Sequence, residues 1–413
     1  MNILLIYPRP DTSKRPRFGF SYELLTIATV LQPYHHVTIR DYSCESYDSA
    51  WISEQIEGKS FDLIVLECDS FALKRSQNLI HAKEIISLVN GRIPILAYGN
   101  YCYITKQSFD KADYTVFTND INALIEIINE LSNSSNQIPE LPSYDELPYL
   151  DRSLLSHIDF YRNNQYNTLI QTAKGCENTC VFCQRKGWQS RYVTHSDDYV
   201  LGELRKIRDQ GYKNVWIIDE NFTFNLTRAK RLLVKFCEES LTSDMKLFIS
   251  SWANIDKEFL DLAARCNIRI ISFGIESGSS EILSFYRKNI NLDHAVEMIQ
   301  YAGSKGIFTV GNFILGAPIE SEETIKKTFA VIRECKFDQI NIKTLDYMIG
   351  SELYDSMCDS LKVSDHVFAC RENGLTKFSL ADLIKIKDDF QKEYYAENRL
   401  RIKEKICIFG SPY

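Results

Sequence analysis

GCENTCVFCQ, residues 175–184, places three cysteines within a short stretch of the 413-residue chain. Cys176, Cys180 and Cys183 have the spacing C-x3-C-x2-C. Thiolates are soft ligands that favour iron–sulfur clusters, zinc or copper. Three thiolates on a four-iron cluster leave one iron open to a substrate or cofactor. The spacing therefore favours a [4Fe-4S] cluster with an open iron.

Two other chemistries are compatible with this loop. A structural zinc site closes with four ligands, and the sequence nearby offers only the isolated His157 and His195 as a fourth. A thioredoxin-like dithiol formed by Cys180 and Cys183 leaves Cys176 without a role. Zinc and redox chemistry remain alternatives to the cluster.

The loop follows the first of six apolar runs that alternate with helical patterns. This alternation predicts a partial or open (β/α)6 barrel, in which reactive groups lie at the carboxyl ends of the strands. The cysteine loop is then on the active face. The six predicted strands are residues 167–173, 214–219, 246–251, 268–277, 307–316 and 339–347.

A second series of strands and helices precedes the loop. It predicts a Rossmann-like, doubly wound parallel sheet and thus an α/β chain. Pro, Ser and Asn then interrupt the pattern and indicate a linker. The predicted strands are residues 2–7, 37–41, 62–68, 93–99 and 114–117. The predicted domains are 1–135 for the sheet, 136–160 for the linker, 161–350 for the barrel, and 351–413 for a helical tail that covers the active site.

Composition narrows the class of protein. The net charge of −7 gives no basic footprint for nucleic acid. The short apolar start is not a signal peptide, and no apolar stretch approaches the length of a membrane helix. We therefore expect a cytoplasmic protein without a membrane partner, in which the 12 cysteines are reduced thiols rather than a disulfide framework.

With Phe182 just before its last cysteine, the motif resembles the signature of the radical S-adenosylmethionine (radical SAM) superfamily, and the resemblance extends over roughly residues 165–350. It implies that the open iron binds the amino and carboxylate groups of S-adenosylmethionine. One electron from the cluster then cleaves a carbon–sulfur bond and gives a 5′-deoxyadenosyl radical that abstracts a substrate hydrogen. A flavodoxin or ferredoxin is the reductant that the family implies.

The resemblance also assigns roles at the strand ends. Phe182 would pack on the adenine ring and Asn312 would face adenine. The carboxylates of Asp219 and Glu220 would meet the methionine ammonium. Glu276 and Ser277 would contact ribose, and the guanidinium of Arg287 would pair with the methionine carboxylate. Helix capping or a solvated charge is the structural alternative for each.

The layout of the first domain is similar to the cobalamin-binding branch of the superfamily. The D-x-H-x-x-G motif that supplies a cobalt ligand is absent, although some members bind cobalamin without it. The loops at 97–104 and 118–122 lack the usual glycines at the ligand-binding edge. We expect a degenerate domain that holds no cobalamin and serves as a scaffold or docks a substrate.

The layout also resembles peptide epimerases that convert L- to D-residues in a ribosomally synthesised precursor peptide. Such an enzyme needs a thiol outside the cluster as hydrogen donor, and Cys370 is the candidate, with Cys335, Cys358 and Cys407 as competitors. A precursor peptide is then the expected partner. The alternatives are a cobalamin-dependent radical SAM methyltransferase and a non-catalytic metal-binding interaction module.

Overall fold

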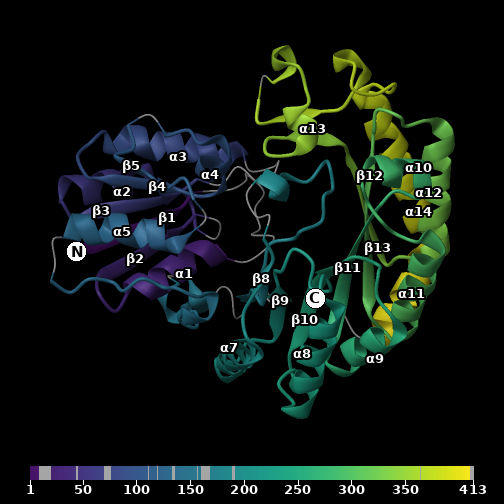
Figure 1. The fold of residues 1–413 in the computed structure, drawn as a ribbon, viewed down its shortest axis with the longest axis horizontal. Helices are drawn as coiled ribbons and strands as arrows, with labels where there is room; N and C mark the ends of the chain where they lie inside the picture. Colours follow the sequence, from purple (N-terminus) through teal and green to yellow (C-terminus); the bar gives the residue numbers. More distant parts are fainter. Residues whose placement is uncertain are drawn as a thin grey trace. The chain divides into compact units, whose positions relative to one another are not determined.

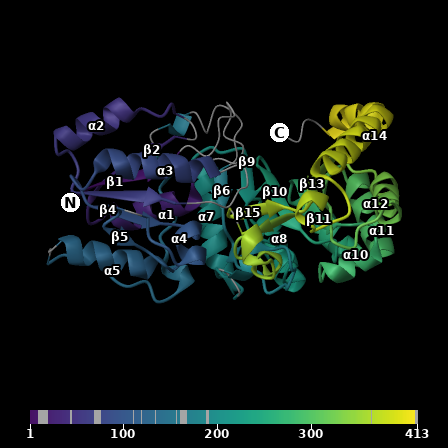
Figure 2. The same ribbon diagram turned by 90° about the horizontal axis from the view of Figure 1, so that it is seen from above.

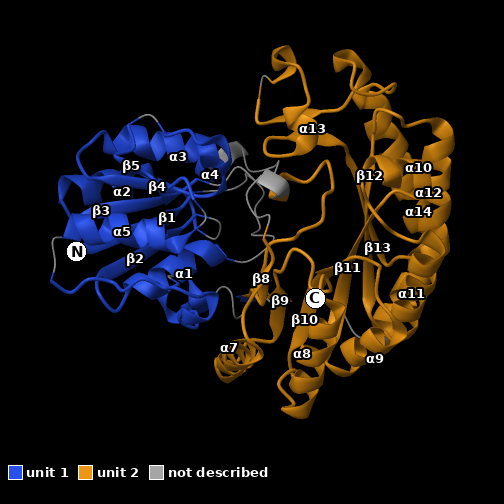
Figure 3. Cartoon of the chain, in the orientation of Figure 1, with its two compact units in different colours: residues 1–169 blue, residues 170–413 orange. Residues whose placement is uncertain are grey.

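The computed structural model describes residues 1–8, 20–42, 45–68, 76–109, 111–118, 120–132, 135–155, 157–159, 168–187, 191–362 and 364–409. The chain forms two compact units, residues 1–169 and 170–413 (Figure 3). The boundary predicted between 160 and 161 lies outside the described residues, as do residue 119 of the second glycine-poor loop and residue 167 of the first barrel strand.

The first unit contains a five-stranded parallel sheet in the order β2-β1-β3-β4-β5. The order reverses between β1 and β3, so right-handed crossovers place α1 on the opposite face from α2 and α3. The doubly wound sheet predicted from the sequence is confirmed (Figure 1). Its elements are β1 (Asn2–Tyr7), α1 (Tyr22–Leu31), β2 (His36–Asp41), α2 (Ser49–Glu57), β3 (Leu63–Glu67), α3 (Ser76–Val89), β4 (Ile95–Tyr98), α4 (Asn100–Thr105), β5 (Tyr114–Thr115) and α5 (Ile121–Ser132).

The segment after α5 is hydrogen-bonded to the first unit. Asn129 exchanges two hydrogen bonds with the backbone of Ile138, each 2.9 Å long. Asn122 does the same with Leu141, at 3.0 and 2.9 Å. Asn122 and Asn129 lie about two helical turns apart on α5. Their side chains therefore hold the following segment along the helix, and this segment belongs structurally to the first unit.

The second unit is built on a six-stranded sheet in the order β13-β12-β11-β10-β9-β6, which is open because the order runs from β13 to β6 without returning (Figure 1). Each described crossover is a helix, as predicted. The strands are β6 (Thr168–Ile170), β9 (Asn214–Ile217), β10 (Lys246–Ser251), β11 (Ile268–Glu276), β12 (Phe308–Leu315) and β13 (Gln339–Thr344). The helices are α7 (Asp197–Asp209), α8 (Leu226–Glu238), α9 (Lys257–Arg265), α10 (Ser280–Phe285), α11 (Leu292–Ser304) and α12 (Glu322–Cys335).

The core of the second unit lies between the sheet and its helices. Alternate strand residues such as Leu247, Ile271 and Phe313 are buried there against helix residues such as Leu232 and Ile299. The other face of the sheet is the inner face of the open barrel. It has a small apolar cluster of Phe248, Ile270, Phe308 and Val310, with polar residues nearer the carboxyl ends. The apolar packing thus leaves the carboxyl end of the inner face for polar chemistry.

The tail contains more than the helix that the sequence predicts. β14 (Asp346–Met348) and β15 (His366–Phe368) form an antiparallel hairpin, and the short helix α13 (Glu352–Asp355) lies between them in the chain. α14 (Leu380–Phe409) follows and runs beside β13 and α12 (Figure 2). No described helix has the length and apolarity to cross a membrane.

Two cysteines correct the expectation that all thiols are reduced. Cys237, at the end of α8, and Cys266, after α9, form a disulfide with a Cα–Cα distance of 5.6 Å. Cys266 is fully buried. The packing of α8 on α9 brings the two Cα atoms to a distance that a disulfide spans without backbone movement, which the linear spacing of the cysteines does not reveal.

Candidate active site

The cysteine loop begins directly after the first barrel strand. It is closed at its base by β7 (Ala173–Lys174), which pairs antiparallel with β8 (Val193–Thr194). Gly175 starts the loop with φ +87°, and a Cβ atom there would lie 2.1 Å from the carbonyl oxygen of Arg191. Only glycine therefore allows the two arms of the loop to approach this closely.

Two carboxylates at the end of β9 hold the first arm of the loop. Asp219 is buried and accepts hydrogen bonds from Thr172 N and Oγ1 (2.6 and 2.5 Å) and from Ala173 N (3.0 Å). Burial raises the pKa of Asp219 to about 6, although these hydrogen bonds oppose the shift. Glu220 accepts from Gly175 N at 3.0 Å. Both predicted cofactor ligands thus brace the loop, and contact with the methionine ammonium stays a prediction.

The second half of the loop is clamped by two other elements. Val181 N donates to Tyr286 O (3.4 Å), and Val181 O accepts from Leu353 N (3.1 Å). The ring of Phe182 packs edge-on against Tyr286, with 5.1 Å between centroids. The loop is therefore held by the end of α10 and the start of α13, and Phe182 has a fixed position from which its predicted stacking on adenine would occur.

The three thiols fit an iron–sulfur cluster. Burial raises the pKa of Cys180 to about 12, and Cys183 and Cys176 raise it because thiolates on one loop repel each other. Asn178 Nδ2 donates to Cys176 Sγ at 3.2 Å. Bound iron would supply the positive charge that lets all three thiols ionise. Within the described ranges no three His, Cys, Asp or Glu side chains are grouped to hold one metal ion, whereas each thiolate of a cluster binds a separate iron.

A buried ion pair that the sequence analysis missed lies at the carboxyl end of β11. Lys288 Nζ is 3.1 Å from Glu276 Oε1, and the two side chains are 3% and 11% exposed. The same ammonium lies 3.9 Å from the ring centroid of Trp252, at the end of β10. A Cβ at Gly274 would be 2.7 Å from Glu276 Oε1, so the glycine makes room for the pair. Glu276 is thus at the active face with its charge compensated.

Arg287 points away from this pair. Its guanidinium makes a bidentate ion pair with Glu352, at 2.8 and 2.6 Å, and its side chain is 49% exposed. Binding of the methionine carboxylate by Arg287 stays a prediction that requires this ion pair to open. The adjacent Lys288 is the buried cation of this turn.

The other two predicted cofactor residues are engaged within the fold. Ser277 Oγ is buried in the turn between β11 and α10 and is 3.1 Å from Thr328 Oγ1 on α12. Asn312 lies on β12, and its Nδ2 donates to Ser272 Oγ (2.9 Å) while its Oδ1 accepts from Asn341 Nδ2 (3.1 Å). These polar side chains form a row across β11, β12 and β13. Their predicted contacts with ribose and adenine are not tested by this arrangement.

Cys370 follows β15 and precedes the short 3-10 turn Arg371–Asn373. Its Sγ accepts from the backbone of Asn373, and its own N–H donates to Asn373 Oδ1 at 3.1 Å. Burial and the neighbouring Glu372 raise the pKa of the Cys370 thiol. The thiol therefore caps a turn, and its role as a hydrogen donor stays a prediction.

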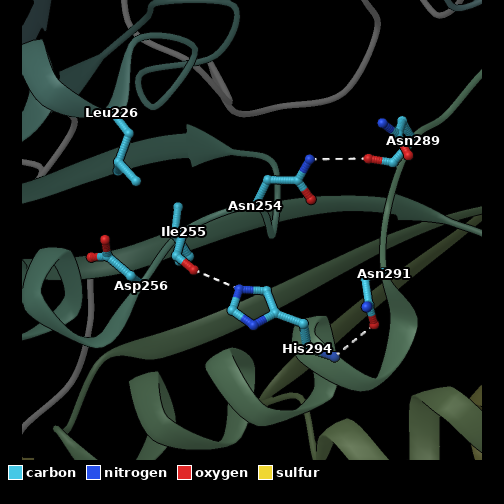
Figure 4. A pocket seen from close by; sticks show the side chains of 7 residues that line it. All are labelled: Leu226, Asn254, Ile255, Asp256, Asn289, Asn291 and His294. Atoms are coloured by element: carbon cyan, nitrogen blue, oxygen red, sulfur yellow. Dashed lines mark hydrogen bonds between the residues drawn. The ribbon is translucent and has the colours of Figure 1, made fainter.

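A cavity of about 410 Å³ lies near the amino ends of helices α8, α9 and α11 (Figure 4). His294 Nε2 donates to Ile255 O at 2.7 Å, and Asn254 Nδ2 donates to Asn289 O at 3.0 Å. Its lining side chains are those of Leu226, Asn254, Ile255, Asp256, Asn289, Asn291 and His294. None of the predicted site residues lines it.

An open six-stranded α/β sheet with a three-cysteine loop after its first strand is the architecture of a radical SAM domain. Residues 170–332 match the model of the radical SAM superfamily. This part of the chain is thus similar to radical SAM domains, a class in which the implied cofactors are a [4Fe-4S] cluster and S-adenosylmethionine. Cys176, Cys180 and Cys183 are the residues that would hold the cluster.

Known proteins similar to this chain include methyltransferases. It is 28% identical to an uncharacterized methyltransferase of Pyrococcus horikoshii over 54% of this chain and 47% of that protein. It is 30% identical to cytidylyl-2-hydroxyethylphosphonate methyltransferase of Streptomyces wedmorensis over 45% of this chain and 36% of that protein. The chain thus spans less than half the length of each of these relatives.

Two solved structures have the same fold. The radical S-adenosylmethionine methyltransferase TsrM from Kitasatospora setae, with cobalamin and a [4Fe-4S] cluster bound, superposes with a TM-score of 0.70 at 16% identity, over 85% of this chain and 73% of that chain. The cobalamin-dependent S-adenosylmethionine radical enzyme OxsB gives 0.65 at 17% identity, over 87% and 55%. The comparisons give no support to the peptide-epimerase hypothesis and favour its methyltransferase alternative.

Proposed function

We propose that the protein is a cobalamin-dependent radical SAM methyltransferase. The observation that carries this proposal is the shared fold with TsrM and OxsB over more than four fifths of the chain, a share too large for the radical SAM domain alone. The proposal replaces the expectation of a first domain without cobalamin, because both of these neighbours bind cobalamin. The methyltransferases among the sequence relatives support the same reaction class.

The first unit offers a suitable edge for a large flat cofactor. In a sheet of this order, ligands bind beyond the carboxyl ends of the strands where the order reverses, which here is between β1 and β3. Ser21 Oγ donates to the buried Glu67 at this edge, at 2.6 Å. The flanking loops 9–19 and 69–75 lie outside the described residues. We assign no cobalt ligand, because the sequence has no histidine in the usual motif.

In the second unit, the chain's own residues position the reductive chemistry. The cluster, when bound, supplies the electron that cleaves S-adenosylmethionine. Asp219 and Glu220 fix the loop that carries the thiols, while Tyr286 and Leu353 hold its far side. These contacts fix the backbone of the loop whose three thiols would hold the cluster. Cys180 is buried, and Cys176 and Cys183 are half-buried.

The experiment that tests the proposal is anaerobic reconstitution with iron, sulfide and hydroxocobalamin. We expect about one cobalamin retained per chain and release of S-adenosylhomocysteine under reducing conditions. Cys180→Ala serves as a matched control, because it should retain cobalamin and lose reductive formation of 5′-deoxyadenosine. Absence of retained cobalamin would contradict the methyltransferase. The epimerase would instead be established if a peptide incorporated deuterium from deuterated water and this incorporation were lost in Cys370→Ala. Absence of any cleavage would favour a non-catalytic module.

A further inference from the structure

Lys288 is a buried cation beside the cysteine loop, and no predicted cofactor contact accounts for it. Its side chain is only 3% exposed, although lysine rarely loses this much hydration. The carboxylate of Glu276 and the face of Trp252 replace the water. Such a pair is not by itself stabilising, because desolvation of two charges offsets their attraction. The presence of the buried Lys288–Glu276 pair therefore needs an explanation other than stability.

The turn around Lys288 is built to hold the charge in place. Arg287 has φ +54° and Glu276 has φ +71°, both in the left-handed region that non-glycine residues avoid. These two conformations direct Arg287 outward and turn the side chains of Glu276 and Lys288 toward each other. Replacing the hydrogen of Gly274 with a methyl group would also put a carbon 3.1 Å from Lys288 Nζ. Strained backbone and a missing Cβ therefore both serve one ion pair.

The ion pair is also close to the metal-binding loop. Val181, which follows Cys180, donates to the carbonyl of Tyr286, two residues before Lys288. Charges in a low-dielectric site act strongly on one another. Reduction of an iron–sulfur cluster adds one negative charge, and net charge nearby is one of the factors that set its potential. A fixed ammonium favours the reduced form, and a fixed carboxylate disfavours it.

We propose that Lys288 and Glu276 set the reduction potential of the cluster bound by Cys176, Cys180 and Cys183. When bound, the cluster would be reduced by one electron from a flavodoxin or ferredoxin, a step in which no bond forms or breaks. Lys288 raises the potential, and Glu276 offsets part of that effect. Both are positioning residues that act through the cluster. The inference rests on the proposed function only for the presence of the cluster.

The test is a potentiometric titration of the anaerobically reconstituted protein, followed by electron paramagnetic resonance, without S-adenosylmethionine or cobalamin. In Lys288→Met we expect the ratio of reduced to oxidised cluster at a fixed potential to fall about tenfold, which is about 59 mV for one electron. In Glu276→Gln the ratio should rise. Opposite signs distinguish electrostatics from damage to the fold, which would move both variants in one direction.

The chain offers matched controls for this experiment. Arg287→Met removes the neighbouring positive charge, which is exposed and paired with Glu352, and should leave the potential unchanged. Lys288→Arg keeps the charge and should stay close to wild type, which gives a readout even if Lys288→Met binds no iron. The proposal is wrong if Lys288→Met and Glu276→Gln shift together, or if Arg287→Met shifts as much as Lys288→Met. Since no methyl transfer is measured, failure of the proposed function leaves this result unaffected.

Discussion

Gly175 is the first residue of the cysteine loop. It has a positive φ and lies so close to the backbone of Arg191 that a side chain does not fit. Gly175→Ala should place a methyl group against the backbone of Arg191 and push the arms of the loop apart. We expect the variant to bind much less iron than wild type, measured as iron and sulfide per chain after anaerobic reconstitution. Gly211→Ala is the control, because its φ of +81° carries the same strain of roughly 1 kcal/mol but nothing lies within 4 Å of the new Cβ. Equal iron content in both variants would contradict this account.

Asp219 predicts a pH dependence of stability. Its pKa is about 6 in the folded protein against an ordinary value of 3.8, so between these values the folded state binds more protons than the unfolded state. The free energy of unfolding contributed by this group therefore falls as pH rises from about 4 to 6 and is constant above that. A shift of this size corresponds to roughly 3 kcal/mol.

Asp219→Asn removes the titration and should remove that part of the slope. The measurement is the urea midpoint of the anaerobic protein at several pH values from 4 to 7, compared between wild type and the variant. The gap between them should change across pH 4–6 and be constant from 6.5 upward. Parallel curves over the whole range would show that burial does not raise the pKa of this carboxyl group.

At the level of single residues, the sequence identifies the type of site better than its members. The three cysteines are recognisable because their spacing is itself the signal. Arg287 and Lys288 are adjacent, and both are cations suited to a carboxylate. Which one is buried depends on the left-handed backbone at Arg287, which no local pattern predicts. Likewise, only the three-dimensional contacts show that Asp219 and Glu220 bind the loop backbone.

Among the elements, the buried strands are predicted to within one or two residues at most ends, because both faces of a parallel sheet require continuous apolar runs. β10 matches its predicted range of 246–251 in full. The β14–β15 hairpin is missed because its two strands have three residues each, too few for a periodic pattern. α4 is missed because most of its six residues fall within the stretch 97–104, which the sequence analysis assigns to a ligand-binding loop.

α14 is fixed to the barrel by a buried charge cluster that supports a prediction at this scale. Asp338, just before β13, is fully buried and accepts from Thr309 N (2.8 Å), Arg401 Nη1 (3.0 Å) and Lys405 Nζ. Lys405→Ala removes one of the two cations and should destabilise the second unit by roughly 1.5 to 3 kcal/mol in urea unfolding, the range for a hydrogen bond to a charged group. Lys403→Ala, on the exposed side of the same helix, should have little effect. Similar losses for both would contradict a specific role for the cluster.

At the scale of the whole molecule, the division into a doubly wound sheet and an open barrel follows from the order of apolar runs, and the structure agrees. The domain edges are less certain from sequence. Composition alone assigns the stretch after α5 to a linker, yet Asn122 and Asn129 bind its backbone to the first unit. Hydrogen bonds between these two side chains and a distant backbone segment leave no trace in the composition. The proline and polar content of the segment therefore suggests a flexible linker, whereas the structure shows a segment bound to α5.

This difference can be tested with two fragments. Residues 1–155 should unfold at a higher temperature than residues 1–135, because the longer fragment keeps the four hydrogen bonds of Asn122 and Asn129. At about 1 kcal/mol for each bond, the gain is of order several kcal/mol before the entropy of ordering the segment is subtracted. Equal melting temperatures would show that the segment acts only as a connector.

The contact between Asp338 and Lys405 has a consequence for the order of events during biosynthesis. The two residues are separated by 67 positions. At a translation rate of 5–20 residues per second, roughly 3 to 13 s pass after the ribosome adds the aspartate before it adds the lysine. During that interval the edge of the nascent barrel carries a carboxylate whose counter-charges have not yet been made. The Asp338–Lys405 contact therefore waits for the synthesis of α14, and slow codons between these positions should prolong the exposure of the incomplete domain to chaperones and proteases.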